Sequence, residues 1–166
     1  MNDIYTHKFN TPIGWIYTAE TDRGLVMISL GKDAKRRFDA FIRNYPDSRA
    51  IAGGKENKKA ELQIKSYLDG RLKKFTLKLD RGGTPFQRKA LNKVAAIPYG
   101  KVKTYGQIAA ALGKPGAARA VGGANAGNPL PLVIPCHRVV AAGGLGGYAG
   151  DVKIKKRLLQ LEGAIE

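Results

Sequence analysis

Residues 134–139 read Ile-Pro-Cys-His-Arg-Val, and this stretch contains the only cysteine of the 166-residue chain. A thiolate is a strong nucleophile, but a free thiol has a pKa near about 8.5 and is mostly protonated at neutral pH. His137 could take that proton from Cys136. On an extended strand the two side chains would point to opposite faces, so a turn after Pro135 or a bridging water is required. The alternative is a buried, inert cysteine, the usual state of a free thiol.

The sequence on either side of Cys136 favours a ligand pocket. Residues 129–134 form an apolar run that leads into the cysteine, and residues 141–150 form a glycine-rich segment that contains Tyr148. An apolar approach, a nucleophile and a flexible loop with one aromatic ring suit a flat ligand.

The charge of the chain indicates a polyanionic partner. The formal net charge is +16, and residues 81–166, with 13 basic and three acidic side chains, contribute +10 of it. Nucleic acid is the first expectation for such a surface. A solvated basic surface and an anionic membrane are the alternatives, and charge alone does not separate the three.

The amino-acid composition excludes several classes of protein. A hydrophobic fraction of 43% predicts a folded core. A single cysteine excludes an internal disulfide and fits a reducing compartment, so we expect a cytoplasmic protein, or a nuclear one in a eukaryote. No run is long enough to span a bilayer, and the first residues lack the form of a signal peptide. The only histidines, His7 and His137, cannot form a Cys/His metal site with one cysteine, and no cofactor motif is present.

The fold class predicted is α+β, with a small N-terminal α/β scaffold domain, residues 1–80, and a mainly helical C-terminal domain, residues 84–166. In the first half, short apolar segments at 4–6, 13–17 and 25–30 predict strands, and helical spacing predicts helices near 38–45 and 60–68. Alternation over 74–79 predicts a further strand. No catalytic grouping is visible in this half, and Trp15 is interpreted as a core residue.

Helix-capping patterns predict where the helices of the second half of the chain begin. Thr84-Pro85-Phe86-Gln87 and Thr104-Tyr105-Gly106-Gln107 each begin a helix with a capping box. A Gly-Lys-Pro-Gly turn at 113–116 then leads into a helix over 117–126, so the pair predicts a winged-helix-like helix-turn-helix. A last helix begins at Asp151, and its basic run, residues 153–157, is interpreted as a solvated face.

The helix over 117–126 has one long charged side chain, Arg119, among small residues that include Gly122 and Gly123. Glycine within a helix costs about 1 kcal/mol relative to alanine, so another demand must outweigh helix propensity. Close approach to DNA through the minor groove is one such demand, because a major-groove reader would carry several long polar side chains. Close packing against another helix is the alternative.

The motif Pro-Cys-His-Arg-Val at 135–139, preceded by Gly-Asn-Pro at 127–129, resembles the O6-alkylguanine-DNA alkyltransferases. The Leu-x-x-x-Glu-Gly pattern of that family matches residues 158–163. The resemblance is specific over residues 84–163 and weak before them. It implies direct DNA repair, in which an alkyl group on guanine O6, or on thymine O4, moves from duplex DNA to the protein's own cysteine in a single turnover. It also implies a monomer that needs no cofactor and no membrane.

The resemblance also implies residue roles. Cys136 would be the nucleophile and alkyl acceptor, His137 would deprotonate it through water, and Glu162 would orient His137. Tyr105 would help rotate the nucleotide and supply a proton to the leaving guanine, and Asn128 would brace the loop that carries the cysteine.

Further implied roles concern DNA and the flipped base. Arg119 would replace the extruded nucleotide in the stack. The remaining DNA contacts would come from Ala118, Ala120, Gly122 and Gly123, and the base pocket from Pro131, Val139, Tyr148 and the backbone of Ala149. Asp151 departs from the family's glycine-rich pattern. A non-enzymatic binder of alkylated DNA and a cysteine hydrolase are the rival functions. The first would lack the cysteine, and the second would not explain the charge or the Arg119 helix.

Overall fold

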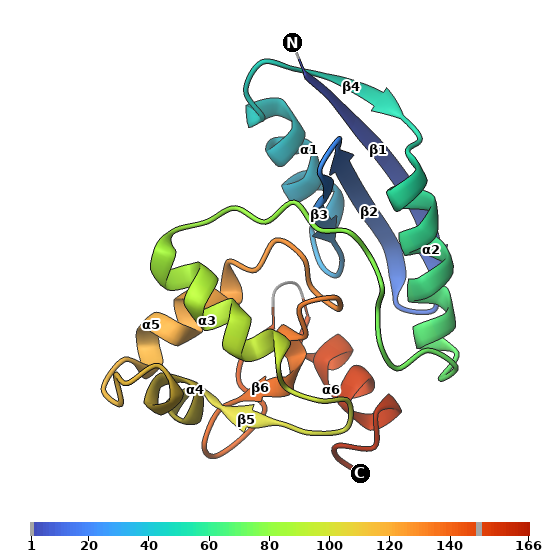
Figure 1. Cartoon of the computed structure of the whole chain (residues 1–166). Coiled ribbons are helices and arrows are strands. Elements are labelled where there is room, and N and C mark those ends of the chain that lie inside the picture. Colours follow the sequence, from blue (N-terminus) through green and yellow to red (C-terminus); the bar gives the residue numbers. More distant parts are fainter. Residues whose placement is uncertain (1, 149–150) are drawn as a thin grey trace. The chain divides into compact units, whose positions relative to one another are not determined.

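The computed structural model describes residues 2–148 and 151–166, and the chain divides into two units between Arg81 and Gly82. The first unit is a sheet with two helices, and the second is mainly helical (Figure 1). The α+β class predicted from the sequence is therefore confirmed.

A mixed four-stranded sheet in the order β3-β2-β1-β4 forms the centre of the first unit. The strands are β1 (Asn2–Thr11), β2 (Gly14–Thr21), β3 (Gly24–Ser29) and β4 (Ser48–Ala52). The first three are antiparallel neighbours, whereas β4 pairs parallel with β1. The sequence did not predict β4, which is short and half exposed and lacks an alternating apolar pattern.

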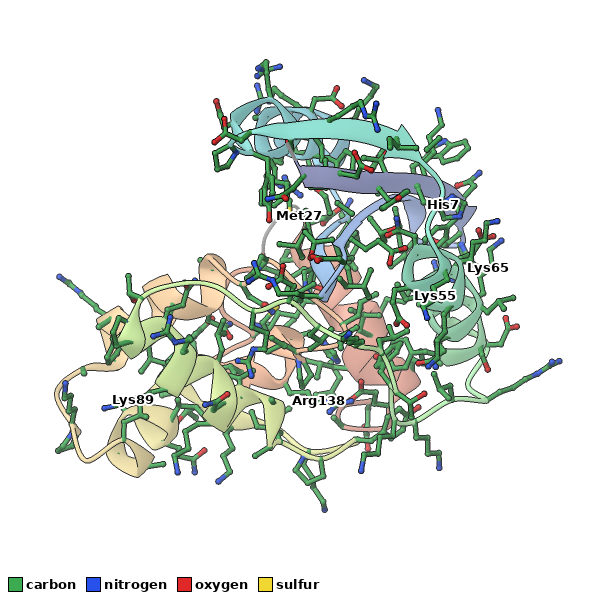
Figure 2. All side chains as sticks on the ribbon, turned by 45° about the horizontal axis from the view of Figure 1, so that its top comes forward. His7, Met27, Lys55, Lys65, Lys89 and Arg138 are labelled. Carbon is green, nitrogen blue, oxygen red and sulfur yellow. The ribbon has the colours of Figure 1, made fainter. Side chains whose placement is uncertain are left out.

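Helices α1 (Ala34–Asn44) and α2 (Lys55–Leu68) cover the two faces of this sheet. Successive side chains of a strand point to opposite faces. Accordingly, Ile4 of β1 packs with Phe38 of α1, whereas His7 of β1 lies 2.6 Å from a carboxylate oxygen of Glu61 in α2. Lys65 donates to the same carboxylate, and Figure 2 shows His7 and Lys65 on the same side of the unit.

Two expectations for the first unit were wrong. Residues 74–79 are extended but form no strand, because their only ladder contact is a bridge between Leu79 and Leu25 at the edge of β3. Phe75 instead packs on the ring of Tyr67, 5.4 Å between centroids, so the apolar alternation reflects contact with α2. Trp15 is not a core residue: it is 49% exposed, and the ammonium of Lys8 lies 5.5 Å from its ring.

In the described part of the second unit the α-helices are α3 (Pro85–Ala95), α4 (Tyr105–Ala111), α5 (Ala118–Ala126) and α6 (Val152–Leu161). The hydroxyls of Thr84 and Thr104 accept hydrogen bonds from the backbone N–H groups of Gln87 and Gln107, both at 3.1 Å. The side chain of Gln107 completes the second box by accepting from Thr104 N–H. These local signals fix where α3 and α4 begin.

Helices α3, α4 and α5 pack on one another, and α4 and α5 form the helix-turn-helix pair. A two-stranded parallel sheet, β5 (Lys103–Thr104) with β6 (Val139–Val140), joins this pair to the segment that follows the cysteine. Because β5 ends where α4 begins and β6 begins one turn after Cys136, this pairing brings Tyr105 to the neighbourhood of Cys136.

Candidate active site

Cys136 begins a short 3₁₀ turn, Cys136–Arg138, that follows Pro135. The turn satisfies one of the two conditions that the sequence left open, since consecutive side chains of a 3₁₀ turn do not point to opposite faces. Cys136 is 4% exposed, and its N–H donates to the carbonyl of Ile134 at 2.7 Å. The Cys136 side chain is therefore almost completely enclosed.

Two asparagines brace the backbone around the cysteine. The Asn128 side chain donates to the carbonyl of Ile134 at 2.8 Å and accepts from the N–H of Leu130 at 3.0 Å. Asn125 donates from α5 to the carbonyl of Cys136 at 3.2 Å. The sequence pointed to Asn128 but not to Asn125, whose side chain lies within a run of small residues that gave no separate signal.

A buried carboxylate connects the two residues that follow the cysteine. Glu162, at the end of α6, accepts from Nε2 of His137 at 2.7 Å. It also accepts from Arg138 through Nε at 2.8 Å and Nη2 at 3.0 Å, and from the N–H of Gly100 at 3.3 Å. Arg138, which Figure 2 labels, also donates to the carbonyl of Ile97 at 2.7 Å.

Glu162 therefore orients two side chains, and Arg138 is a member of the site that the sequence did not predict. Its two-point geometry suits a guanidinium facing a carboxylate. Arg138 and Glu162 lie 24 positions apart in the chain, so no local sequence pattern could have predicted their contact.

Burial sets the protonation of the pair at rest. It raises the pKa of the Cys136 thiol above its ordinary value, although the hydrogen bond from Asn128 and the charge of Lys155 favour the thiolate. Burial also lowers the pKa of His137, although its bond to Glu162 opposes that change. Both effects disfavour the charged form, so the thiol and the imidazole are both neutral at rest.

A pocket of about 360 Å³ opens onto the cysteine. The residues around it come from α4, α5, the cysteine turn and the glycine-rich segment: Tyr105, Gly122, Asn125, Ala126, Cys136, Gly147 and Tyr148. Of the predicted base-pocket residues, Tyr148 lines it, whereas Pro131 and Val139 are buried and do not line it. Ala149 lies outside the described residues. Burial raises the pKa of the Tyr105 hydroxyl, so this hydroxyl keeps its proton at neutral pH.

The exposed face of α5 lies next to this pocket. Arg119 and Ala120 are exposed, as is Gly123, and Gly122 and Ala118 are half-buried. A Cβ on Gly123 would meet nothing within 4 Å, and one on Gly122 would meet only the Tyr105 ring, at 4.0 Å. Packing inside the unit therefore does not require a glycine at either position.

Lys155 overturns one expectation. It belongs to the basic run of α6 that was interpreted as solvated, but its side chain is fully buried. The helix begins as predicted, with Asp151 accepting from the N–H of Lys153 at 2.8 Å.

Over residues 2–148 and 151–166, no three side chains of the His, Cys, Asp or Glu type are grouped to hold a metal ion. In the same ranges, no helix has the length and apolar character needed to cross a membrane.

Comparison with known proteins identifies the family. Residues 4–81 match the model of the 6-O-methylguanine DNA methyltransferase ribonuclease-like domain, and residues 85–164 match that of its DNA-binding domain. A methylated-DNA–protein-cysteine methyltransferase of Methanosarcina acetivorans is 41% identical over 162 residues, which is 97% of this chain and 99% of the relative. One of Mycobacterium tuberculosis is 44% identical over 160 residues, 96% and 92% of the two chains.

Comparison with solved structures identifies the same family. The crystal structure of M. tuberculosis OGT in complex with DNA superposes with a TM-score of 0.83 at 35% identity, covering 96% of this chain and 93% of that one. The O6-methylguanine-DNA methyltransferase of Pyrococcus kodakaraensis gives 0.70 at 29% identity, covering 96% and 99%. The resemblance inferred from residues 84–163 is thereby confirmed and extends over both units: the chain belongs to the methylated-DNA–protein-cysteine methyltransferase family.

Proposed function

We propose that this protein repairs alkylated DNA by moving the alkyl group from O6 of guanine in a duplex to the sulfur of Cys136. The observation that carries the proposal is the pocket at Cys136, which opens beside the exposed face of α5. Family membership supports the reaction type, and the relative crystallised with DNA supports duplex DNA as the partner. The net charge of +16 suits a polyanion.

The target base must leave the helix before it can react. Guanine O6 lies inside the base stack, so chemistry on it requires the nucleotide to rotate out of the duplex. A pocket of about 360 Å³, with Tyr105 and Tyr148 in its walls, has the size and flat aromatic surfaces that an extruded purine needs. Arg119 would enter the space left in the stack.

The small face of α5 would make the approach possible. Because nothing inside the unit fills the space beside Gly123, the DNA backbone can come close to the helix at this position. Minor-groove docking of this kind needs few long side chains for base edges. Ala118, Ala120 and Gly122 would complete this contact.

The transfer step would begin from a neutral Cys136 thiol and a neutral His137 imidazole. The thiol proton of Cys136 passes to Nδ1 of His137, directly or through a water, because Nε2 faces Glu162. The sulfur attacks the alkyl carbon in line, a C–S bond forms, and the C–O6 bond breaks with its electron pair left on guanine. The Tyr105 hydroxyl donates a proton to the guanine anion and recovers one from the imidazolium. The net result is transfer of one proton and one alkyl group.

The product is a thioether, which is a poor leaving group. The described residues that line the pocket include no second thiol, amine or carboxylate that could remove the alkyl group, so each chain would react once. All the proposed groups come from one unit of one chain, so a monomer suffices. The nucleophile must stay reduced, which fits a cytoplasmic location.

A panel of duplexes tests this function and its substrate class. Each duplex would carry one O6-methylguanine, O4-methylthymine or N7-methylguanine, and loss of the lesion would be followed with wild-type protein and with Cys136→Ser. We expect loss of the O6 lesion, slower loss of the O4 lesion, and no loss with the serine variant. Persistence of the O6 lesion with wild-type protein would exclude the function.

A further inference from the structure

The single tryptophan of the chain lies at an open cavity of the first unit. Trp15, in β2, is 49% exposed and lines a cavity of about 640 Å³, which is called the Trp15 cavity below. Its lining combines residues of β2 with the basic residues Lys35, Arg36 and Arg43 of α1. Ligand sites commonly enclose about 300–1,000 Å³, so this cavity has the size of a binding site. The proposed alkyl transfer uses none of these residues.

The Trp15 ring offers a flat apolar surface beside a positive charge. The ammonium of Lys8 in β1 lies 5.5 Å from the ring centroid, which is a favourable position for a cation at an aromatic ring. Tyr17, two residues further along β2, points to the same face of the sheet. Its ring packs with that of Phe38 in α1, 5.6 Å between centroids. Tyr17 is therefore held by the core of the unit, whereas the Trp15 ring stays accessible to a ligand.

Basic side chains of α1 line the same cavity. Arg36 and Arg43 are seven residues apart, so they lie on one side of the helix, about 10 Å apart along its axis. Arg36 pairs with Asp33 at 3.1 Å. Lys35 pairs with Asp39 at 2.6 Å, and both pairs are exposed. Among the described residues, no acidic side chain lies within ion-pair distance of Arg43. Because exposed ion pairs contribute little stability, an anionic ligand can replace these carboxylates.

An exposed ring beside a row of cations matches single-stranded nucleic acid. Proteins that bind single strands combine aromatic rings, on which bases stack, with a basic groove that follows the phosphates. A duplex keeps its bases stacked on one another, and an acidic peptide carries charge without flat bases. Residues 1–80 have 16 basic and ten acidic side chains and a net charge of +6, so the first unit also favours a polyanion.

We propose that the Trp15 cavity is a second nucleic-acid site, which takes a single strand by stacking one base on the Trp15 ring and holding neighbouring phosphates at Arg36 and Arg43. The site is separate from the Cys136 pocket, because every residue that lines it belongs to the first unit. It requires no alkylated base and does not depend on the proposed function.

The fluorescence of Trp15 gives a direct test, because no other residue of the chain is a tryptophan. A short, unmodified oligothymidylate would be titrated into the whole protein, and quenching of the indole would report stacking. Polyglutamate and inorganic tripolyphosphate are the comparison ligands, since they carry negative charge without bases. We expect saturable quenching by the oligothymidylate and little change with the other two. Absence of quenching, or equal quenching by either comparison ligand, would overturn the proposal.

Charge variants test the phosphate contacts with the same readout. Arg36→Gln and Arg43→Gln each remove one proposed contact, and Lys58→Gln is the control on exposed surface of α2, on the other face of the sheet. A single strand releases about 0.7 counterion for each phosphate contact. Each arginine variant should therefore lower the slope of log affinity against log salt concentration by about 0.7 and weaken binding severalfold.

Lys58→Gln should bind the oligothymidylate as the wild type does, and wild-type binding by both arginine variants would overturn the assigned contacts. All three variants should react with free O6-benzylguanine at the wild-type rate, which shows that they are folded. Failure of the wild-type protein to repair any lesion would refute the proposed function and leave the fluorescence titration interpretable, because the oligothymidylate carries no lesion.

Discussion

Replacing Gly123 tests whether α5 is shaped for DNA or for the fold. The residue lies on the exposed side of α5, and a Cβ added there would meet nothing within 4 Å. Gly123→Ala therefore costs no steric energy within the free protein. Alanine is favoured over glycine in a helix by about 1 kcal/mol, so the variant should be more stable than the wild type, with a melting temperature several degrees higher.

The same substitution should weaken repair of duplex DNA. A larger side chain in a closely packed contact costs about 1–3 kcal/mol, and about 1.4 kcal/mol corresponds to a tenfold loss of affinity. We expect a modest loss with Gly123→Ala and a loss of roughly tenfold or more with Gly123→Leu. Reaction with free O6-benzylguanine, which needs no docking, should proceed at the wild-type rate in both variants.

The assays are thermal unfolding, duplex affinity at a fixed salt concentration, and the two reaction rates. Gly82→Ala is the control, because Gly82 also has open space around it and lies outside the helix. It should leave affinity and both rates unchanged. Wild-type affinity in Gly123→Leu would refute the docking face, and a less stable Gly123→Ala would show that the glycine serves the fold.

Three further predictions concern other parts of the site. Arg119→Ala should slow repair in duplex far more than reaction with free O6-benzylguanine, because the side chain offsets an unstacking cost of about a few kcal/mol; equal losses would mean that Arg119 supports the pocket. Glu162→Gln should lower the free energy of unfolding by roughly 3 kcal/mol in a urea titration, because the buried Arg138 loses its counter-charge. At a temperature where this variant stays folded, the transfer rate should fall more than duplex affinity, and a loss of affinity alone would contradict the assigned role. Burial holds the pKa of His137 below its ordinary value of 6.5. The transfer rate should therefore decline only as pH falls below about 6.5, because the protonated imidazole can no longer accept the thiol proton. A decline in rate that begins above pH 7 would exclude His137 as the base.

Local signals in the sequence predicted local structure well. The N-caps at Thr84, Thr104 and Asp151 each mark a helix start in the structure, since each depends on groups within three residues of one another. The capping box is complete only at Thr104, because the Gln87 side chain donates to the carbonyl of Gly127 instead. The Cys-His pair also predicts a nucleophile with a base, and its turn after Pro135 is present in the structure. In these places the chemistry is carried by neighbours in the chain, so the sequence is sufficient.

Features that depend on distant segments were not predictable. Lys155 looks like its exposed neighbours in sequence, and only the positions of Val139 and Gly147 explain its burial. Arg138 was visible in the motif, but its partner Glu162 is 24 residues away. The alternation over residues 74–79 has the pattern of a strand, although the segment pairs with the sheet only at one bridge.

The most direct test of the central claim is the mass of the protein after reaction. Protein would be mixed with increasing amounts of duplex carrying O6-methylguanine, and intact mass and peptide mapping would locate the added group. The account predicts one methyl group for each chain, on the peptide containing Cys136, and no further repair once every chain is modified. Repair of several lesions by one chain, or methylation at any residue other than Cys136, would contradict it.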